Sequence, residues 1–395
     1  MKPDLLSAEY LNEHCHCSTL EKKKMAYPQY FSDQPHFVSR TQLFQMQQFI
    51  AAYERALRTP EVLRQLTGNS AAPIEQGIFT SYDFHMHADG PQLIEINTNA
   101  AGAVLALDAT RQMINCCDSV DDMLPVRPYR FDAAQFIAMF RSEFARRFPG
   151  RTLETVAIVD EAPEQQFFYP EFLLTQKLLQ EHGISALIVS PEAISISGDE
   201  VYAEQTDGTK TRIDFIYNRL TDFTLENLKH AALREVYDRG LATMSPNPAL
   251  HALYARKSNL AAFWSPAFDQ VGDIALIRRH IPETRVVDES NRDEMWQSRK
   301  EWFFKPVSGF GGKAVYRGDK LTTRVWSEIS AGGYIAQKYV PPRLRQLSAD
   351  LSLKYDLRVY TYGEDILGMM ARYYQGQTTN FRTEHGGLAS VMVAA

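Results

Sequence analysis

The sequence predicts an α/β chain that also contains lobes of mixed α+β type, and three observations lead to this prediction. Residues 155–189 alternate a buried-strand run, a helical segment and a second strand, which is the pattern of a β-α-β unit in a parallel sheet. Residues 82–97 contain two short apolar strands separated by a turn with the sequence Ala-Asp-Gly-Pro, which predicts a hairpin. Residues 302–316 join two strand-like runs through a glycine-rich loop.

The N-terminal region, up to residue 78, is predicted to be mostly helical. Between 40 and 58 the apolar side chains recur at three- and four-residue spacing, which is typical of a helix with one face in the core. Further helices are expected at 103–113 and at 131–148, where Pro149 and Gly150 end the helical pattern.

The run Cys15-His16-Cys17 resembles half of a zinc site. The sequence offers no second Cys/His pair at zinc spacing, so a zinc site is not expected here. The preferred interpretation of Cys15 and Cys17 is a partly exposed N-terminal segment beside a substrate pocket.

Three domains are predicted from changes in the sequence pattern: 1–149, 150–245 and 246–395. The second of these contains the β-α-β unit, followed by an expected hairpin at 194–202 and a strand at 213–219. A Ser-Pro-Asn-Pro sequence at the end of this unit is typical of a domain boundary.

Asn218 and Arg219 form the polar end of that last strand. Ligands of open α/β sheets bind beyond the carboxyl ends of the strands, so these two residues are candidate substrate contacts. The alternative is a salt-bridged interface between domains.

The hairpin near the N-terminus carries Asp83, Glu95 and Asn97. Glu95 and Asn97 are two residues apart on one strand and therefore share a face, and Asp83 on the neighbouring strand can lie opposite them. Two carboxylates and an amide form a hard-oxygen site of the kind that holds Mg²⁺. The alternative is a surface hairpin whose polar side faces water.

The glycine-rich loop is predicted to bind phosphate. It includes Ser308, Gly309, Gly311 and Gly312, and glycines let successive backbone N–H groups converge on phosphate oxygens. Lys305 precedes these residues as a counter-charge. The loop differs from a P-loop in its glycine spacing and from a dinucleotide fingerprint in the strand that follows it. The alternative is an ordinary tight turn.

Lys305-Pro306, the glycine-rich loop and the following strand together resemble the phosphate-covering loop of the ATP-grasp ligases. Lys257, 48 residues before Lys305, is similar to the first nucleotide-contacting lysine of that family. The segment from 334 to 340 resembles the strand and hinge that receive adenine. In this segment the resemblance implies the following nucleotide contacts: Gln337, Lys338, Tyr339 and Val340.

Two further segments near the C-terminus resemble the same family. Arg358 and Arg372 lie in runs similar to the paired strands that carry an arginine near the transferred phosphate, and the resemblance implies a catalytic role for both. Thr379-Asn380 with Gly386-Gly387 resembles the Asn and Gly-Gly segment, although the gap between them is longer than the family pattern. Asn380 is therefore a further candidate substrate contact.

The order of these segments resembles a circular permutation. In an ordinary ATP-grasp chain the Asp…Glu-x-Asn strands follow the glycine-glycine segment, whereas here Asp83 and Glu95, 12 residues apart, come first. The same rotated order is found in glutathionylspermidine synthetase and its relatives. The resemblance thus implies a circularly permuted ATP-grasp fold, in which 150–245 is an inserted Rossmann-like pre-ATP-grasp domain.

The resemblance also implies the function. It points to an ATP-dependent carboxylate–amine ligase with one or two Mg²⁺ ions, which forms an amide through an acyl phosphate and releases ADP and phosphate. The expected partners are a small-molecule carboxylate and a small-molecule amine. A kinase on the same fold and a non-catalytic ATP-binding regulator are the alternatives.

Composition narrows the class of protein further. The net charge of −6 argues against a general nucleic-acid binder. The chain shows no apolar run of membrane-spanning length and no signal peptide, so a cytoplasmic protein without membrane partners is expected. The sequence does not predict the oligomeric state.

Overall fold

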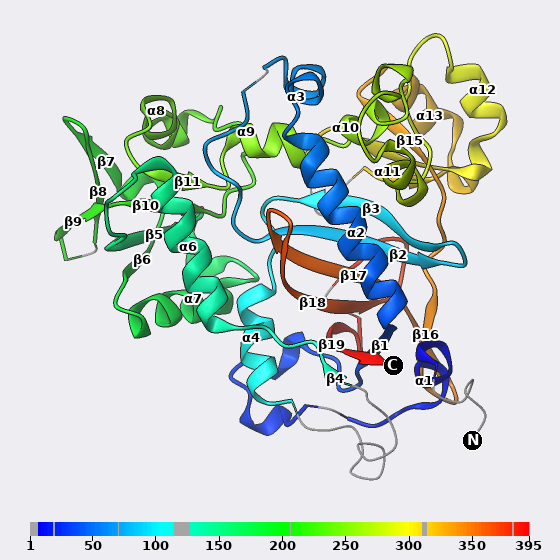
Figure 1. The fold of residues 1–395 in the computed structure, drawn as a ribbon, viewed down its shortest axis with the longest axis horizontal. Coiled ribbons are helices and arrows are strands. Elements are labelled where there is room, and N and C mark those ends of the chain that lie inside the picture. Colours follow the sequence, from blue (N-terminus) through cyan, green and yellow to red (C-terminus); the bar gives the residue numbers. More distant parts are fainter. Residues whose placement is uncertain are drawn as a thin grey trace.

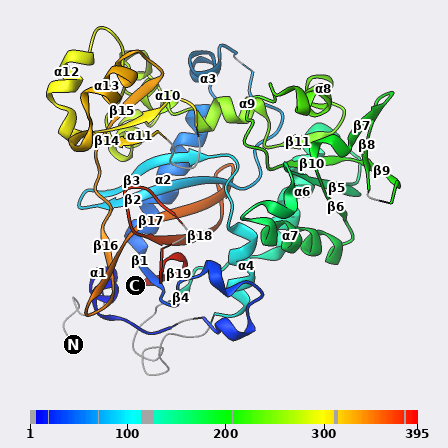
Figure 2. The ribbon, with the colours of Figure 1, turned by 180° about the vertical axis from the view of Figure 1, so that it is seen from behind.

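The central sheet of the computed structural model joins strands from both ends of the chain. Figures 1 and 2 show the cyan N-terminal hairpin beside the orange-red C-terminal strands. Within the described ranges, which are 7–18, 20–69, 71–113, 127–205, 207–309, 314–380 and 383–394, this sheet has eight strands. Six of them follow the order β1 (His36–Ser39), β19 (Gly387–Ala394), β18 (Asp365–Tyr374), β17 (Leu351–Tyr362), β2 (Thr80–His87) and β3 (Gly90–Asn97).

The predicted hairpin at 82–97 is confirmed as β2 and β3, which pair antiparallel. β2 also pairs antiparallel with β17, so that Asp83 lies opposite Arg358. This neighbourhood is the one that a permuted ATP-grasp order requires, and the permutation itself stays a prediction. Two short strands complete the sheet: β16 (Leu344–Ser348) pairs with β17, and β4 (Arg127–Pro128) pairs with β19.

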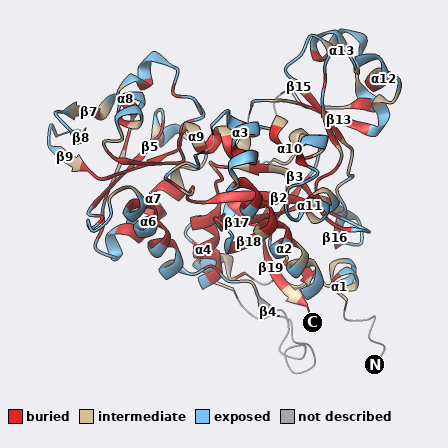
Figure 3. Cartoon of the chain, turned by 45° about the horizontal axis from the view of Figure 1, so that its top comes forward, coloured by how far each residue is buried: buried red, intermediate tan, exposed pale blue. Residues whose placement is uncertain are grey.

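The predicted amphipathic helix is confirmed as α2 (Arg40–Leu57), which crosses one face of the central sheet (Figure 1). Its buried side chains include Phe49, Ile50 and Tyr53, and they share one core with Tyr82 of β2. Figure 3 shows the central strands as mostly buried and the outer faces of the helices as exposed. Helix α2 therefore covers one face of the sheet.

A capping box starts α2. The Ser39 hydroxyl accepts a hydrogen bond from the Gln42 N–H at 3.1 Å, and the Gln42 side chain accepts one from the Ser39 N–H at 2.9 Å. We expect Ser39→Ala to lower the free energy of unfolding by about 1 kcal/mol, because an orphan N–H of the first turn loses its acceptor. Urea titration would show this as a lower midpoint with an unchanged slope. Ser39→Asp should retain most of the stability, and an equal loss in both variants would contradict a capping role.

The region before residue 78 is less helical than predicted. It contains α1 (Ala8–His14), α2 and α3 (Pro60–Thr67), but residues 36–39 form strand β1, which pairs parallel with β19. Four residues carry too little periodicity to predict a strand, and this one is set by its distant partner. Arg345, which is fully buried, holds the N-terminal segment by donating to the carbonyl oxygens of Asn12 and Cys15.

The predicted β-α-β unit is confirmed. β5 (Thr155–Val159) and β6 (Ser185–Val189) are parallel and are connected through α7 (Tyr169–Glu181). The full sheet has the order β11 (Thr243–Ser245), β10 (Phe215–Asn218), β5 and β6. The predicted hairpin is also confirmed, as β7 (Ile194–Ser197) and β8 (Glu200–Glu204).

The strand expected at 213–219 is confirmed for residues 215–218, but the prediction of one continuous strand from residue 213 is wrong. The chain forms β9 (Lys210–Ile213) in the small sheet with β8, and then β10 in the parallel sheet. Asp214 stands at the change of sheet, where its carboxylate accepts hydrogen bonds from the Glu154 and Thr155 N–H groups, both at 3.1 Å. These bonds fix a break that the apolar pattern does not reveal.

A further antiparallel sheet lies above the β2–β3 end of the central sheet in Figure 1. Its order is β12 (Thr284–Val286), β15 (Tyr334–Lys338), β13 (Trp302–Pro306) and β14 (Tyr316–Arg317). The predicted strands at 302–304 and 334–340 are confirmed, while the strand expected at 314–316 begins only at Tyr316. The remaining helices are α4 (Ala103–Arg111), α6 (Ala133–Arg147), α8 (Ala231–Arg239), α9 (Pro248–Leu250), α10 (Ser258–Ala262), α11 (Ile274–His280), α12 (Arg292–Gln297) and α13 (Thr323–Ser330).

No helix among the described residues is long and apolar enough to cross a membrane.

Candidate active site

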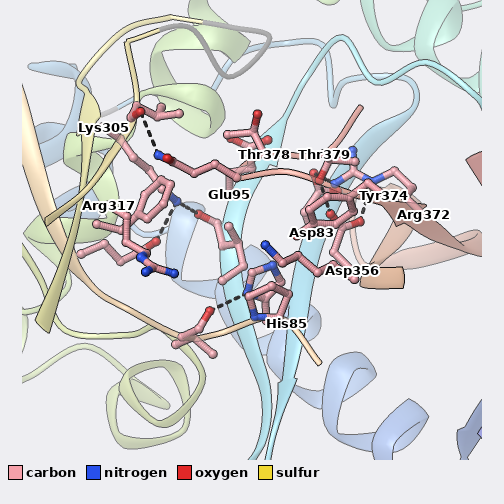
Figure 4. A pocket seen from close by; sticks show the side chains of 18 of the residues that line it. Asp83, His85, Glu95, Lys305, Arg317, Asp356, Arg372, Tyr374, Thr378 and Thr379 are labelled. Carbon is pink, nitrogen blue, oxygen red and sulfur yellow. Dashed lines mark hydrogen bonds and ion pairs between the residues drawn. The ribbon is translucent and has the colours of Figure 1, made fainter. Parts of the chain in front are cut away.

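A cavity of about 590 Å³ lies between the central sheet and the β12–β15 sheet. Figure 4 shows that Lys305 and Arg317 reach it from one side, and Asp83, Asp356 and Arg372 from the other. The structure brings most of the predicted site residues to this one cavity. Those that line it are Asp83, Glu95, Asn97, Lys305, Gln337, Lys338, Tyr339, Val340, Arg358 and Arg372.

The three predicted metal ligands lie together. Asp83 and Glu95 are directly opposite each other in the β2–β3 ladder. The Asn97 side-chain nitrogen donates to Asp83 Oδ2 at 3.1 Å and to Glu95 Oε1 at 3.4 Å. The Glu95 carboxylate and the Asn97 amide oxygen fit a hard divalent cation such as Mg²⁺ once the amide turns its oxygen toward the ion, whereas Asp83 would have to exchange an arginine N–H group for the ion.

Asp83 is also the centre of a buried ion-pair network. Arg358 binds its carboxylate in bidentate fashion, with Nε to Oδ1 at 2.8 Å and Nη2 to Oδ2 at 2.7 Å. Arg372 donates to Asp83 Oδ2 at 2.8 Å and to Asp356 Oδ1 at 2.5 Å. Burial alone would raise the pKa of Asp83, but the two guanidinium groups outweigh it and hold that pKa below its usual value. Asp83 is therefore a carboxylate at neutral pH.

Lys305 is held against the predicted metal site by a β-bulge. The β2–β3 register shifts after Asp83, so that Phe84 faces Leu93 and Ile94 is the extra residue. The Ile94 carbonyl oxygen accepts a hydrogen bond from Lys305 Nζ at 2.8 Å, and Gln337 Oε1 accepts another at 2.8 Å. Burial lowers the pKa of Lys305 to about 8, although Glu95 opposes this shift.

The residues predicted to contact adenine already form several hydrogen bonds and an ion pair within the protein. The Gln337 amide positions Lys305, as described above, and also donates to Thr284 at 3.3 Å. The Tyr339 N–H donates to the Glu301 carbonyl at 2.8 Å, and His85 Nδ1 lies 2.7 Å from the Val340 carbonyl oxygen. Lys338 forms an ion pair with Glu301 at 2.5 Å, so its ammonium is held at the rim.

The glycine-rich loop is only partly described. Ser308 and Gly309 are exposed, and Gly311 and Gly312 lie outside the described residues. Lys257 Nζ donates to the Gly309 carbonyl oxygen at 3.1 Å, which places this lysine beside the loop, as predicted. Ser308 lines neither the large cavity nor the smaller one described below.

None of the three predicted substrate contacts lines the large cavity, and of these only Arg219 lines the smaller one described below. Asn218 is buried, and its amide donates to the Pro246 carbonyl at 3.3 Å and accepts from the Leu220 N–H at 3.1 Å. Asn380 donates to the Gln375 carbonyl at 2.8 Å beside Thr379. Neither of the two cavities is lined by Asn218 or by Asn380, so their contact with a substrate stays a prediction. The same holds for Cys15 and Cys17, which line neither cavity.

The sequence reasoning missed several polar residues of the large cavity. These are His85, Arg317, Lys320, Lys354, Asp356, Tyr374, Gln377 and Thr378. The alternation of side chains along a strand indicates two of these residues. His85 is two residues after Asp83, and Tyr374 is two residues after Arg372, so each pair shares a face of its strand. Asp356 has a defined structural role, because its carboxylate accepts hydrogen bonds from Arg372 and from Thr379, both at 2.5 Å.

His251 contacts Thr98, the residue that follows strand β3. It is buried, its Nδ1 contacts the Thr98 hydroxyl, and its ring packs against Phe223 at a tilt, with centroids 4.3 Å apart. Burial lowers the pKa of His251 to about 3.

We expect this histidine to make the protein acid-sensitive. The folded-state pKa lies below the unfolded value of about 6.5, so its contribution to stability is present above pH 6.5 and declines as the pH falls. Between pH 7 and pH 5 the wild type should lose about 2 kcal/mol more stability than His251→Gln does. Denaturant unfolding at both pH values measures this difference. Parallel pH profiles for the two proteins would contradict it.

No protein-family model matches this chain, and no curated protein matches its sequence. Solved structures do match. A glutathione synthetase-like effector from Globodera pallida has a TM-score of 0.55 and 12% identity, with 91% of this chain and 89% of that chain covered.

Two other structures match at lower TM-scores. A putative gamma-glutamylcysteine synthetase from Methylobacillus flagellatus has a TM-score of 0.47 at 12% identity, with coverage of 90% and 89%. The ATP-grasp ligase PsnB in complex with a minimal precursor has a TM-score of 0.35 at 13% identity, with coverage of 62% and 77%. At the level of fold, the chain thus resembles the glutathione synthetase-like effector, and it is the mixed α/β protein that its sequence predicted.

Proposed function

We propose that this protein is an ATP- and Mg²⁺-dependent ligase that joins a carboxylate to an amine and releases ADP and phosphate. The observation that carries the proposal is the meeting of Asp83, Glu95 and Asn97 with Lys305 across a cavity of about 590 Å³. Oxygen ligands for a cation and a buried ammonium group for phosphate are the two elements that a phosphoryl-transfer site needs. The volume is within the range of about 300–1,000 Å³ usual for small-molecule sites.

Each residue would have a defined role in the reaction. Asp83, Glu95 and Asn97 would hold Mg²⁺, which when bound neutralises charge on the β- and γ-phosphates. Lys305, fixed by Ile94 and Gln337, would contact the inner phosphates.

The two arginines would act on the transferred phosphoryl group. Arg358 and Arg372 are tied to Asp83, so their remaining N–H groups are oriented before a substrate arrives. Such pre-oriented donors stabilise developing negative charge without reorganisation during the reaction. A substrate carboxylate would attack the γ-phosphate, ADP would leave, and an amine would then displace phosphate from the acyl phosphate.

The products of ATP cleavage test this proposal. The protein is incubated with ATP, Mg²⁺ and pools of amino acids, short peptides and polyamines, and ADP, AMP and phosphate are separated and quantified. Equal amounts of ADP and phosphate, formed only with a substrate pool, support the ligase. AMP and pyrophosphate would refute it, and so would failure to bind Mg-ATP.

A kinase on the same fold is distinguished by the same assay. It would release ADP without free phosphate, because the phosphoryl group would stay on the substrate. Mg-ATP binding without turnover in any pool would favour a regulator.

A further inference from the structure

A second cavity of about 300 Å³ lies between the end of strand β3 and the parallel sheet. Asn97 and Arg358 line both this cavity and the large one, so the two meet at the proposed reaction centre. Its volume is at the lower end of the range for ligand sites, which suits one small molecule rather than a nucleotide.

Arg219 is a buried cation on the wall of this cavity. Its side chain is only 7% exposed, and no salt bridge within the described part of the chain joins it to a carboxylate, although Glu171 and Asp160 interact with it electrostatically. Nη1 donates to the Tyr217 hydroxyl at 3.1 Å and to the Ala100 carbonyl at 3.5 Å, while Nε has no hydrogen-bond partner. An unpaired guanidinium away from water is unfavourable, and an anionic ligand would offset this.

Asp160 lies next to Arg219 on the same wall. Val159 and Asn218 are register partners in the parallel strands β5 and β10, so Asp160 and Arg219 are the next residues at the carboxyl edge of the sheet. Asp160 is 9% exposed and has no ion-pair partner among the described residues. Its Oδ1 accepts only the Glu161 N–H, at 2.8 Å. The two opposite charges are thus adjacent but do not neutralise each other by contact.

The rest of the wall combines aromatic rings with polar side chains, among them Asn99, Thr221 and Lys257. Phe168, Phe172 and Phe223 line the cavity, and the Arg219 guanidinium lies 5.7 Å from the centre of the Phe172 ring. Burial against these residues favours an apolar group on the ligand.

We infer that this cavity binds one free α-amino acid with a large apolar side chain, with its carboxylate at Arg219 and its ammonium group at Asp160. The inference rests on the proposed function, in which this amino acid is one of the two substrates. Both charges of the ligand meet a buried, unpaired protein group of opposite sign, and its side chain meets the phenylalanines.

Calorimetric titration without ATP tests this inference with matched ligands. L-phenylalanine and L-leucine are compared with L-phenylalaninamide, which lacks the carboxylate, and with 3-phenylpropionate, which lacks the ammonium group. The wild type should bind one or both amino acids, and it should bind the two analogues at least tenfold more weakly than L-phenylalanine.

Arg219 and Asp160 follow two different strands, and substituting each of them should weaken the binding of different ligands. Arg219→Gln should weaken L-phenylalanine binding at least tenfold but leave the amide nearly unaffected. Asp160→Asn should weaken L-phenylalanine similarly but leave 3-phenylpropionate unchanged or bound more tightly. Arg234→Gln, on the exposed face of α8, is the matched control and should behave as the wild type. If Arg219→Gln does not fold, the binding of the same ligands to Asp160→Asn decides whether the inference holds.

The outcomes separate this inference from the proposed function. Mg-ATP binding, measured in parallel, should be the same in all these proteins. Equal binding of L-phenylalanine and its amide, or no binding of either amino acid by protein that binds Mg-ATP, would overturn the inference alone. Amino-acid binding by protein that never binds Mg-ATP would leave the cavity assignment standing and refute the ligase.

Discussion

Replacing Glu95 with glutamine is expected to reduce ATP turnover at least about a hundredfold while leaving the fold intact. The substitution keeps the size of the side chain and removes one of the two carboxylates that face Asn97. Loss of one charge-stabilising contact at a phosphoryl-transfer site costs on the order of 3 kcal/mol in the transition state. Initial rates of ADP formation over a series of Mg²⁺ concentrations measure the effect, and the Mg²⁺ required for half-maximal rate should rise.

Stability should change little in the same variant, because Glu95 is only partly buried and no arginine among the described residues is hydrogen-bonded to it. Glu289→Gln, at an exposed turn before α12, is the control for loss of one carboxylate and should retain wild-type rates. Turnover within threefold of the wild type in Glu95→Gln would rule out a metal-binding role for Glu95. Unfolding of that variant would support a purely structural hairpin.

Removing Asp83 should have a different effect, which is a large loss of stability together with the loss of turnover. Asp83 is 1% exposed, and its carboxylate pairs with Arg358 and Arg372. Breaking a buried ion pair by removing one partner leaves an uncompensated charge, at a cost of about 3–5 kcal/mol. We therefore expect Asp83→Ala to lower the free energy of unfolding by about this amount, as measured by urea titration.

A double variant tests the cause of that loss. Asp83→Ala combined with Arg358→Met removes one unpaired guanidinium along with the carboxylate, so it should recover part of the stability but none of the activity. Asp89→Ala, at the exposed turn of the same hairpin, is the matched control and should stay close to the wild type. If Asp83→Ala were as stable as Asp89→Ala, the ion-pair network would not contribute to folding.

Local periodicity predicted the elements that carry the site. The alternation of strands placed Glu95 and Asn97 on one face, and the turn between them and Asp83 predicted the pairing that the structure contains. The glycine-rich sequence after Lys305 predicted a loop between strands. These features depend on neighbours within about twenty residues, which is the range over which periodicity and turn chemistry act.

The division of 213–219 between two sheets and the strand at 36–39 were not predictable in this way. Asp214 breaks the first segment through hydrogen bonds to backbone groups that come 59 and 60 residues earlier in the chain. The second is a strand only because β19 pairs with it. Short segments take their conformation from such partners more than from their own residues.

By itself, the sequence predicted that Glu95 and Asn97 share one face of a hairpin with Asp83 opposite them, since residue type and spacing are local properties. Only the tertiary structure decided how those groups are paired. Arg358 and its partner Asp83 are 275 residues apart in the sequence. Lys305 and the Ile94 carbonyl at the bulge are 211 residues apart. The tertiary structure also left Arg219 buried with no hydrogen-bond partner for its Nε among the described residues, because burial and pairing depend on which distant segments meet.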